Sequence, residues 1–361
     1  MIEGAPTNWE LFSFEKSMDS FSRLNKAPSR TLEINGKEYL FFGGTSYLGI
    51  GGCKKFQQHC IEGVRKYGFS NGTSRSNNVQ LGIFERAESE MAVRFAAGGA
   101  LLSSSGFLAG QLVVRYFANF GEIIYGPNSH PALWLDEKPI SYSTFEDWIL
   151  KTVTYINRSD RTRFLIISDS LNNFHPQLFD FTPFSKISET KEVILLVDDS
   201  HGIGVTYDGK GIYNALPSVP HIQKIVVASL AKGIGIDGGV VLAKQGIIDQ
   251  LKASPMFSAA SPPSPAFLYA FIKSEEIYQE NRERLKSNMM FFAEHISDKL
   301  QYTKGFPVFY AENPELYEQL VKKGVVISSF NYPQASDPLM NRIVINSLHT
   351  EADLRYLLSC L

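Results

Sequence analysis

The hydrophobic pattern of the chain contains short continuous apolar runs and longer stretches with helical spacing. Helical spacing predicts helices over residues 54–67, over 81–97, and from a turn of small residues at 104–106 to about residue 117. The continuous runs are typical of strands buried on both faces of a parallel sheet. They occupy residues 100–102, 122–125, 163–169, 193–197, 226–228 and 238–243. This alternation predicts an α/β fold with a mainly parallel sheet.

The two ends of the chain have other patterns. Residues 32–42 alternate around Asn35-Gly36, which predicts a β-hairpin, and residues 1–30 predict an arm or helix lying on another surface. A proline-rich elbow at 257–265 precedes a long helical pattern at about 266–300. Short strands at 307–310, 325–328 and 342–347 and a helix from 351 to the end complete the prediction. We therefore predict an arm and hairpin (1–45), a large domain (46–245) and a small α+β domain (246–361).

The composition narrows the possible functions and compartments. The 361 residues include 35 Lys plus Arg and 37 Asp plus Glu, a formal charge of −2, which gives no electrostatic reason to expect nucleic acid or an acidic membrane. The three cysteines have no metal-ligand spacing and predict a reducing compartment, with the cytoplasm as the default. No apolar run approaches the roughly 18 residues of a membrane span.

Polar residues end two of the predicted strands. Asp198 and His201 follow the run at 193–197, and Lys232 follows the run at 226–228. In open α/β sheets the ligand crevice lies outside the carboxyl ends of the strands, so these three side chains are expected to converge.

The three residue types suit pyridoxal 5'-phosphate (PLP). PLP requires an amine for a Schiff base, which Lys232 supplies, and a carboxylate against its pyridine nitrogen, which Asp198 supplies. His201 is placed to hydrogen-bond the ring hydroxyl. The alternative is that Asp198 and His201 only cap the next helix, so the other parts of the site must decide.

Further candidates lie in loops and at a strand start. The amides of Gly106 and Phe107 at a predicted helix N-terminus form a candidate phosphate site. His130 is either a ring-stacking residue or an ordinary surface histidine. Arg342 either binds a substrate carboxylate or forms a surface salt bridge. The chain contains no GxxxxGK[ST], so a P-loop function loses its main support.

Taken in order, these segments resemble the α-oxoamine synthases, fold-type I PLP-dependent enzymes that include 8-amino-7-oxononanoate synthase and 2-amino-3-ketobutyrate CoA ligase. The likeness extends from Tyr47 to His349. It rests on SSGF at 104–107, NSH at 128–130, VDDSHG at 197–202, SLAK at 229–232 and RIVI at 342–345. The resemblance implies the aspartate aminotransferase-like fold, with a seven-stranded-type sheet, helices on both faces and a smaller C-terminal α+β domain.

The resemblance also assigns roles to individual residues. It implies a Schiff base on Lys232, ring stacking by His130, and contacts of Asp198 and His201 with the ring nitrogen and hydroxyl. Arg342 would hold the substrate carboxylate. The remaining cofactor contacts would be Ser105, Gly106, Phe107, Asn173, Ser229 and Ser258.

The chain departs from the family mainly at substrate contacts. Thr45 replaces the asparagine of NDYLG, and Asn173 replaces a serine. In the elbow through which the family's neighbouring subunit contributes a hydroxyl to the phosphate, Ser258 is the nearest hydroxyl in place of the threonine. The glycine loop GGSR reads NGTSR, which places Ser74 among the substrate contacts. The main residues expected to contact the cofactor are therefore kept, but the changes leave the identity of the substrate undecided.

The resemblance implies a homodimer that condenses a small amino acid with an acyl-CoA, with loss of carbon dioxide, to an α-aminoketone. An aminotransferase or a retro-aldol lyase of the same fold is the second hypothesis, because fold does not decide the reaction. The third is a catalytically inactive PLP-fold protein used for binding or assembly.

Overall fold

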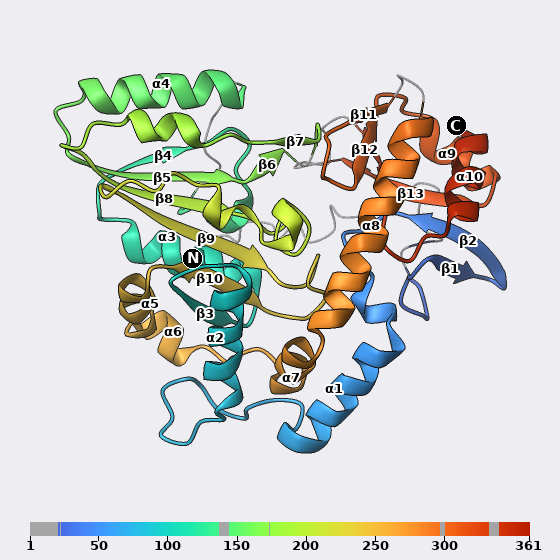
Figure 1. The fold of residues 1–361 in the computed structure, drawn as a ribbon, viewed down its shortest axis with the longest axis horizontal. Coiled ribbons are helices and arrows are strands. Elements are labelled where there is room, and N and C mark those ends of the chain that lie inside the picture. Colours follow the sequence, from blue (N-terminus) through green and yellow to red (C-terminus); the bar gives the residue numbers. More distant parts are fainter. Residues whose placement is uncertain (1–20, 22, 137–143, 173, 297–299, 332–338) are drawn as a thin grey trace, which may run out of the picture.

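The computed structural model describes residues 21, 23–136, 144–172, 174–296, 300–331 and 339–361. Most of the predicted N-terminal arm lies outside these residues. The described chain forms two six-stranded sheets with helices around them (Figure 1), and a small two-stranded ribbon.

The first sheet has the strand order β3-β10-β9-β8-β5-β4. The parallel strands β4, β5, β8 and β9 run side by side, and β10 lies antiparallel between β9 and β3. The strands are β3 (Gly99–Ser103), β4 (Glu122–Tyr125), β5 (Arg163–Asp169), β8 (Glu192–Asp198), β9 (Ile222–Ser229) and β10 (Gly239–Ala243). The α/β prediction is confirmed, although the described residues supply six strands where a seven-stranded type was expected.

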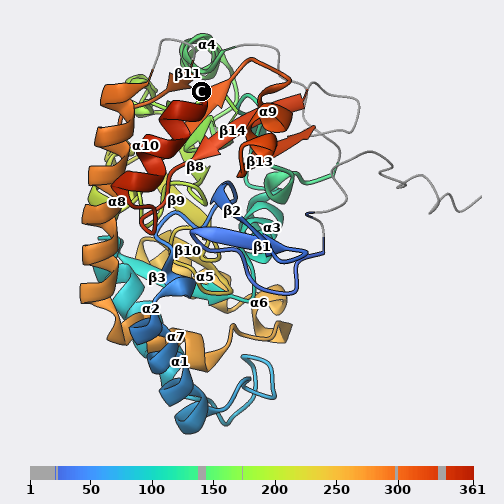
Figure 2. The ribbon, with the colours of Figure 1, turned by 90° about the vertical axis from the view of Figure 1, so that its right-hand side faces the viewer.

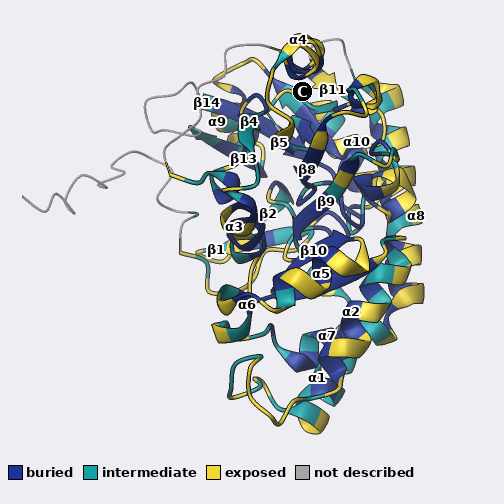
Figure 3. Ribbon diagram, turned by 90° about the vertical axis from the view of Figure 1, so that its left-hand side faces the viewer, coloured by how far each residue is buried: buried dark blue, intermediate teal, exposed yellow. Residues whose placement is uncertain are grey.

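Both faces of this sheet are buried, as the continuous apolar runs predict. On β8, Ile194 and Leu196 pack in a cluster with α3 and α5, while Val193 and Leu195 belong to the larger core with α2 and α4. Figure 3 shows the buried strands enclosed by these layers. The covering helices are α2 (Ile83–Arg94), α3 (Gly106–Phe117), α4 (Phe145–Arg158) and α5 (Gln245–Lys252).

The second sheet combines the two ends of the chain, in the order β1-β2-β13-β14-β12-β11 (Figure 2). The predicted hairpin is confirmed, with Asn35 and Gly36 at positive φ, and β2 pairs in parallel with β13. The strands are β1 (Thr31–Ile34), β2 (Lys37–Phe42), β11 (Leu300–Tyr302), β12 (Val308–Ala311), β13 (Val325–Asn331) and β14 (Leu339–Val344). The hairpin is therefore part of the C-terminal sheet.

The prediction of one long helix at 266–300 is wrong. The structure has α7 (Pro265–Lys273) and α8 (Glu275–His295), separated at Ser274, whose φ of −116° and ψ of 24° leave the helical region. The Ser274 hydroxyl is hydrogen-bonded to His59 of α1 (Lys54–Tyr67) at 2.9 Å. The apolar spacing continues through the break, so periodicity does not reveal it.

The remaining elements are short or terminal. They are the ribbon of β6 (Leu171–Asn172) and β7 (Gln177–Leu178), with α6 (Pro255–Ala259), α9 (Leu316–Lys322) and α10 (Glu351–Cys360). No helix among the described residues has the length and apolar character needed to cross a membrane.

Candidate active site

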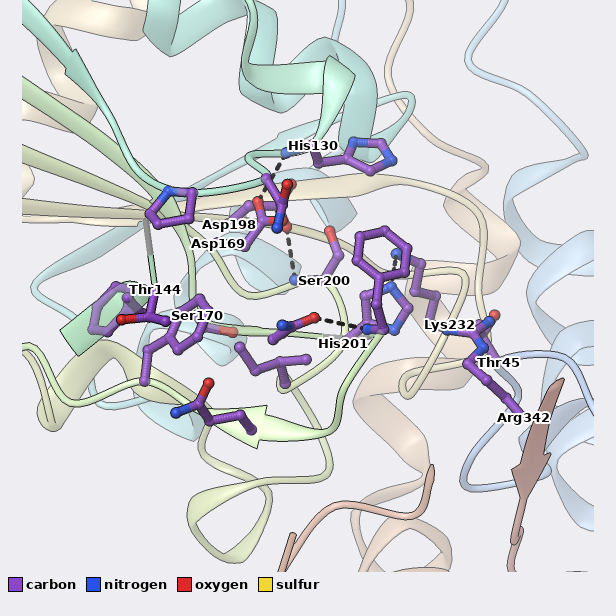
Figure 4. Close-up of a pocket in the computed structure, with 18 of the residues that line it drawn as sticks. Thr45, His130, Thr144, Asp169, Ser170, Asp198, Ser200, His201, Lys232 and Arg342 are labelled. Atoms are coloured by element: carbon purple, nitrogen blue, oxygen red, sulfur yellow. Dashed lines mark hydrogen bonds between the residues drawn. The ribbon is translucent and has the colours of Figure 1, made fainter. Parts of the chain in front are cut away.

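A cavity of about 730 Å³ lies at the carboxyl ends of the parallel strands, between the two sheets. Its walls include five of the predicted site residues: Thr45, His130, Asp198, His201 and Lys232. Arg342 of β14 enters it from the second sheet. The convergence expected from the strand ends is therefore present, and Figure 4 shows these side chains around one space.

Two carboxylates lie next to each other at the strand ends. Asp169 ends β5 and Asp198 ends β8, and the two are direct neighbours in the parallel register. The Asp198 carboxylate accepts the Ser200 N–H at 2.8 Å, and the Asp169 carboxylate accepts the His130 N–H at 3.2 Å. Burial, and then the charge of Asp198, raises the pKa of Asp169 well above its ordinary value. The Ser200 N–H therefore holds the Asp198 carboxylate in place, and the neighbouring Asp169 carboxyl favours the neutral form.

Lys232, His201 and Tyr47 form a chain of hydrogen bonds. The Nζ atom of Lys232 lies 3.0 Å from Nε2 of His201, and Nδ1 of His201 lies 2.7 Å from the Tyr47 hydroxyl. Burial lowers the pKa of Lys232, and burial together with the charge of Lys232 lowers the pKa of His201 well below its ordinary value. The site therefore makes the charged forms of both groups less favourable than they are in water.

His130 lies on the cavity wall, in the loop after β4. Its Nδ1 accepts the N–H of Ala132 at 3.1 Å, which orients the ring. Burial lowers the pKa of His130 despite the opposing effect of Asp198. A neutral, oriented ring with an exposed face suits stacking on a flat ligand.

Arg342 provides the positive charge at the other end of the cavity. It is buried on β14, opposite Ser328 and Tyr310 of the neighbouring strands, and its guanidinium lies 4.9 Å from the centre of the Phe330 ring. Thr45 lies near it on the cavity wall (Figure 4). The guanidinium is therefore held by the sheet on the side of the cavity that also contains Lys232.

Ser105, Gly106 and Ser229, three of the predicted cofactor contacts, lie together beside the cavity. Ser105 caps α3 by accepting the Leu108 N–H, and a Cβ added to Gly106 would lie 2.6 Å from Cβ of Ser229. The N-terminus of α3 thus lies directly against the end of β9. Phe107 is 59% exposed at this helix start.

These residues fit PLP on structural grounds. The amine of Lys232 lies in the same cavity as a fixed carboxylate, Asp198, while a close-packed helix N-terminus lies at the adjacent strand end. The donor set therefore suits a flat, phosphate-bearing aldehyde with a ring nitrogen.

Two other predicted residues, Ser74 and Ser258, are neither on the cavity wall nor at the N-terminus of α3. They lie in a loop and in α6 that are joined by the bond from the Ser76 N–H to the Ser258 carbonyl. Asn173 lies outside the described residues.

Sequence reasoning missed Asp169 and the role of Tyr47. Asp169 ends a predicted strand, so the rule that found Asp198 was sufficient to find it as well. Tyr47 comes from the distant N-terminal segment, and only the fold brings it to His201. The aromatic wall of the cavity, with Phe145 stacked on Phe179 at 3.9 Å, was also missed.

Comparisons with known proteins agree with this geometry. Residues 139–361 match the family model of aminotransferase class I and II, and the chain belongs to that family. The 8-amino-7-oxononanoate synthases of Thermosipho melanesiensis and Petrotoga mobilis are 26% and 25% identical to it. These matches cover 91% and 93% of this chain and 88% and 91% of the relatives.

Solved structures of the same type share the fold. Serine palmitoyltransferase of S. paucimobilis, solved with bound PLP and myriocin, gives a TM-score of 0.79 at 18% identity, over 95% of this chain and 92% of that one. The 8-amino-7-oxononanoate synthase of Francisella tularensis gives 0.66 at 21%, over 89% and 96%. The predicted resemblance to the α-oxoamine synthases, the PLP-dependent transferase class and the fold are thus confirmed.

Proposed function

We propose that this protein condenses a small amino acid with an acyl-CoA, releasing CoA thiol and carbon dioxide and forming an α-aminoketone. The observation that carries the proposal is the shared cavity in which Lys232 and Asp198 face the arginine fork of Arg342. An amine, a carboxylate for a ring nitrogen and a guanidinium for a substrate carboxylate are the groups this chemistry requires.

Each residue has a definite task in this proposal. Bound PLP supplies an electron-withdrawing ring that stabilises negative charge at the substrate α-carbon. The Lys232 amine would hold the cofactor by its aldehyde, and Nζ would serve as the base that takes the substrate α-proton and later returns a proton. Asp198 would keep a proton on the ring nitrogen, His130 would cover the ring face, and His201 would donate to the ring hydroxyl. Arg342 orients the amino acid by its carboxylate.

The phosphate would be held by the amides of Gly106 and Phe107 together with the Ser105 and Ser229 hydroxyls. A second subunit would complete this end with Ser258, and the homodimer is part of the proposal. Its support is the exposed apolar surface near these phosphate contacts: Phe107 on α3 is 59% exposed, and in the 68–80 loop Phe69 is 77% and Val79 is 71% exposed. We propose a cytoplasmic location on the basis of the three free cysteines.

The reaction is tested by following thiol release and product mass together. The purified protein with PLP receives glycine, alanine or serine, and then a series of acyl-CoAs. We expect free thiol to appear with one amino acid and one class of acyl-CoA, together with an aminoketone of the matching mass. Conversion of the cofactor to its pyridoxamine form, with a 2-oxo acid product and no thiol release, would establish an aminotransferase instead.

Replacing Arg342 by lysine is expected to raise KM for the amino acid about 10- to 100-fold, because a bidentate charged pair is worth roughly 1.5–3 kcal/mol. KM for the acyl-CoA should change little. The matched control is Arg94→Lys, which alters another partly buried arginine that contacts the ring of Phe271 far from the cavity. Equal effects on both KM values would contradict the assignment of Arg342 to the amino acid.

A further inference from the structure

Tyr47 reaches the active site from the N-terminal segment of the chain. It is 1% exposed and packs edge-on against Phe306 at 5.8 Å. Its hydroxyl is 2.7 Å from Nδ1 of His201, whose Nε2 is 3.0 Å from the amine of Lys232. A buried phenol therefore lies behind the histidine that faces the reactive amine.

We infer that Tyr47 is a positioning residue that fixes the tautomer of His201, with the hydrogen on Nε2, and thereby keeps the Lys232 amine neutral and ready to bind an aldehyde. The inference rests on the proposed function for the identity of that aldehyde as PLP. It goes beyond that function because it concerns the protein before the cofactor is attached.

The hydrogen-bond accounting favours one arrangement. A neutral imidazole carries one hydrogen, on Nδ1 or on Nε2. Among the described residues, the hydrogen-bond partner of the Tyr47 hydroxyl is Nδ1 of His201, which can donate or accept according to the tautomer. If Nδ1 carried the hydrogen, the buried O–H of Tyr47 would lose that acceptor, which is unfavourable. Tyr47 therefore donates to Nδ1, and Nε2 carries the hydrogen.

This tautomer has a direct consequence for Lys232. An Nε2–H pointing at Nζ is a donor, and only a neutral amine has a lone pair to accept it. An ammonium group would present a second donor to the same hydrogen. Burial raises the pKa of Tyr47, so the phenol keeps the hydrogen that it donates. The chain from Tyr47 to Lys232 thus favours the neutral amine.

Other charges act on Lys232 from the surrounding elements. Asp198 on β8 and Asp169 on β5 favour its charged form, and Arg342 on β14 disfavours it. His130 and His201 are both neutral at pH 7, because burial lowers their pKa values. Tyr47→Phe changes none of these charges. A change in the titration of Lys232 in that variant therefore reports the tautomer of His201.

The first test reads the tautomer in the full chain without added PLP. Nitrogen-15 NMR of histidine-labelled protein distinguishes Nε2–H from Nδ1–H, and His201→Gln identifies the signals of His201. We expect Nε2–H in the wild type and a substantial Nδ1–H population in Tyr47→Phe. Nδ1–H in the wild type would overturn the inference even if the variant did not fold.

The second test follows attachment of PLP to Lys232 as a function of pH, by borohydride reduction and peptide mass spectrometry. In Tyr47→Phe we expect the midpoint to rise by about one pH unit, equivalent to about tenfold less neutral amine at neutral pH. Tyr278→Phe is the matched control, because Tyr278 is also buried and donates to the nearby Ile234 carbonyl at 2.7 Å without touching His201.

The outcomes separate this inference from the proposed function. Equal midpoints in the wild type and both variants would overturn the role of Tyr47. The same upward shift of the midpoint in both variants would also overturn the role of Tyr47, because the cause would then be a general loss of packing around the site. Absence of PLP on Lys232 in every protein would refute the proposed function, while the NMR result would still decide the tautomer.

Discussion

Lys232→Ala is expected to lose PLP attachment and to lower the condensation rate by about 10³-fold or more, because the variant lacks both the amine and the base for the α-proton. Lys232 is the lysine on the cavity wall, at the end of β9 and next to His201. The measurement is borohydride reduction followed by peptide mass spectrometry, with thiol release assayed in parallel. Reduced PLP on another lysine, at wild-type yield, would show that the central assignment is wrong.

Lys224→Ala is the matched control for this variant. Lys224 lies on β9, the strand that Lys232 follows, burial lowers its pKa as well, and its amine lies 4.7 Å from the centre of the Tyr213 ring, away from the cavity. We expect normal PLP attachment and normal thiol release in this variant. The comparison shows whether the loss in Lys232→Ala comes from the place of Lys232 in the cavity or from removal of any partly buried lysine.

Asp198→Asn is expected to bind PLP and to slow exchange of the substrate α-proton about 10²- to 10⁴-fold, the range typical of positioned proton chemistry. The amide keeps the size of the carboxylate but cannot hold a proton on the ring nitrogen by its charge. Exchange is measured by proton NMR in deuterated buffer, and binding by the cofactor absorbance. An exchange rate equal to that of the wild type would exclude Asp198 as the ring-nitrogen partner.

Asp169→Asn tests which of the paired carboxylates performs this task. Burial already favours the neutral form of Asp169, and an asparagine imitates that form. Its Oδ1 can still accept the His130 N–H. We therefore expect a much smaller loss than in Asp198→Asn. The reverse order of effects would transfer the role to Asp169.

The central sheet and its site edge were predictable from local patterns. The run at 193–197 is apolar throughout because its side chains alternate between two buried layers, with Ile194 in one and Leu195 in the other. Such a strand ends where the core ends, so Asp198 marks the edge of the sheet in the sequence itself. The same reasoning places Lys232 at this edge of the sheet. An amine and a carboxylate there, from Lys232 and Asp198, indicate the class of cofactor.

The break between α7 and α8 and the mixed second sheet were not predictable in this way. Ser274 interrupts a helix whose apolar spacing continues, and its hydroxyl partner, His59, is 215 residues away. The hairpin at 31–42 pairs with β13, near the other end of the chain. Contacts between such distant residues do not change the local spacing of apolar residues, so that spacing cannot reveal them.

The sequence by itself determined the fold class, the strand-end residues and the chemistry that suits them. The apolar or polar character of each successive residue indicates whether a strand is buried and where it ends. Only the tertiary structure decided that Asp169 lies beside Asp198 and that Tyr47 supports His201 behind Lys232. Those relations depend on strand order and on the packing of distant segments. Proton positions in the site follow from such neighbours, and no single segment of the chain contains them.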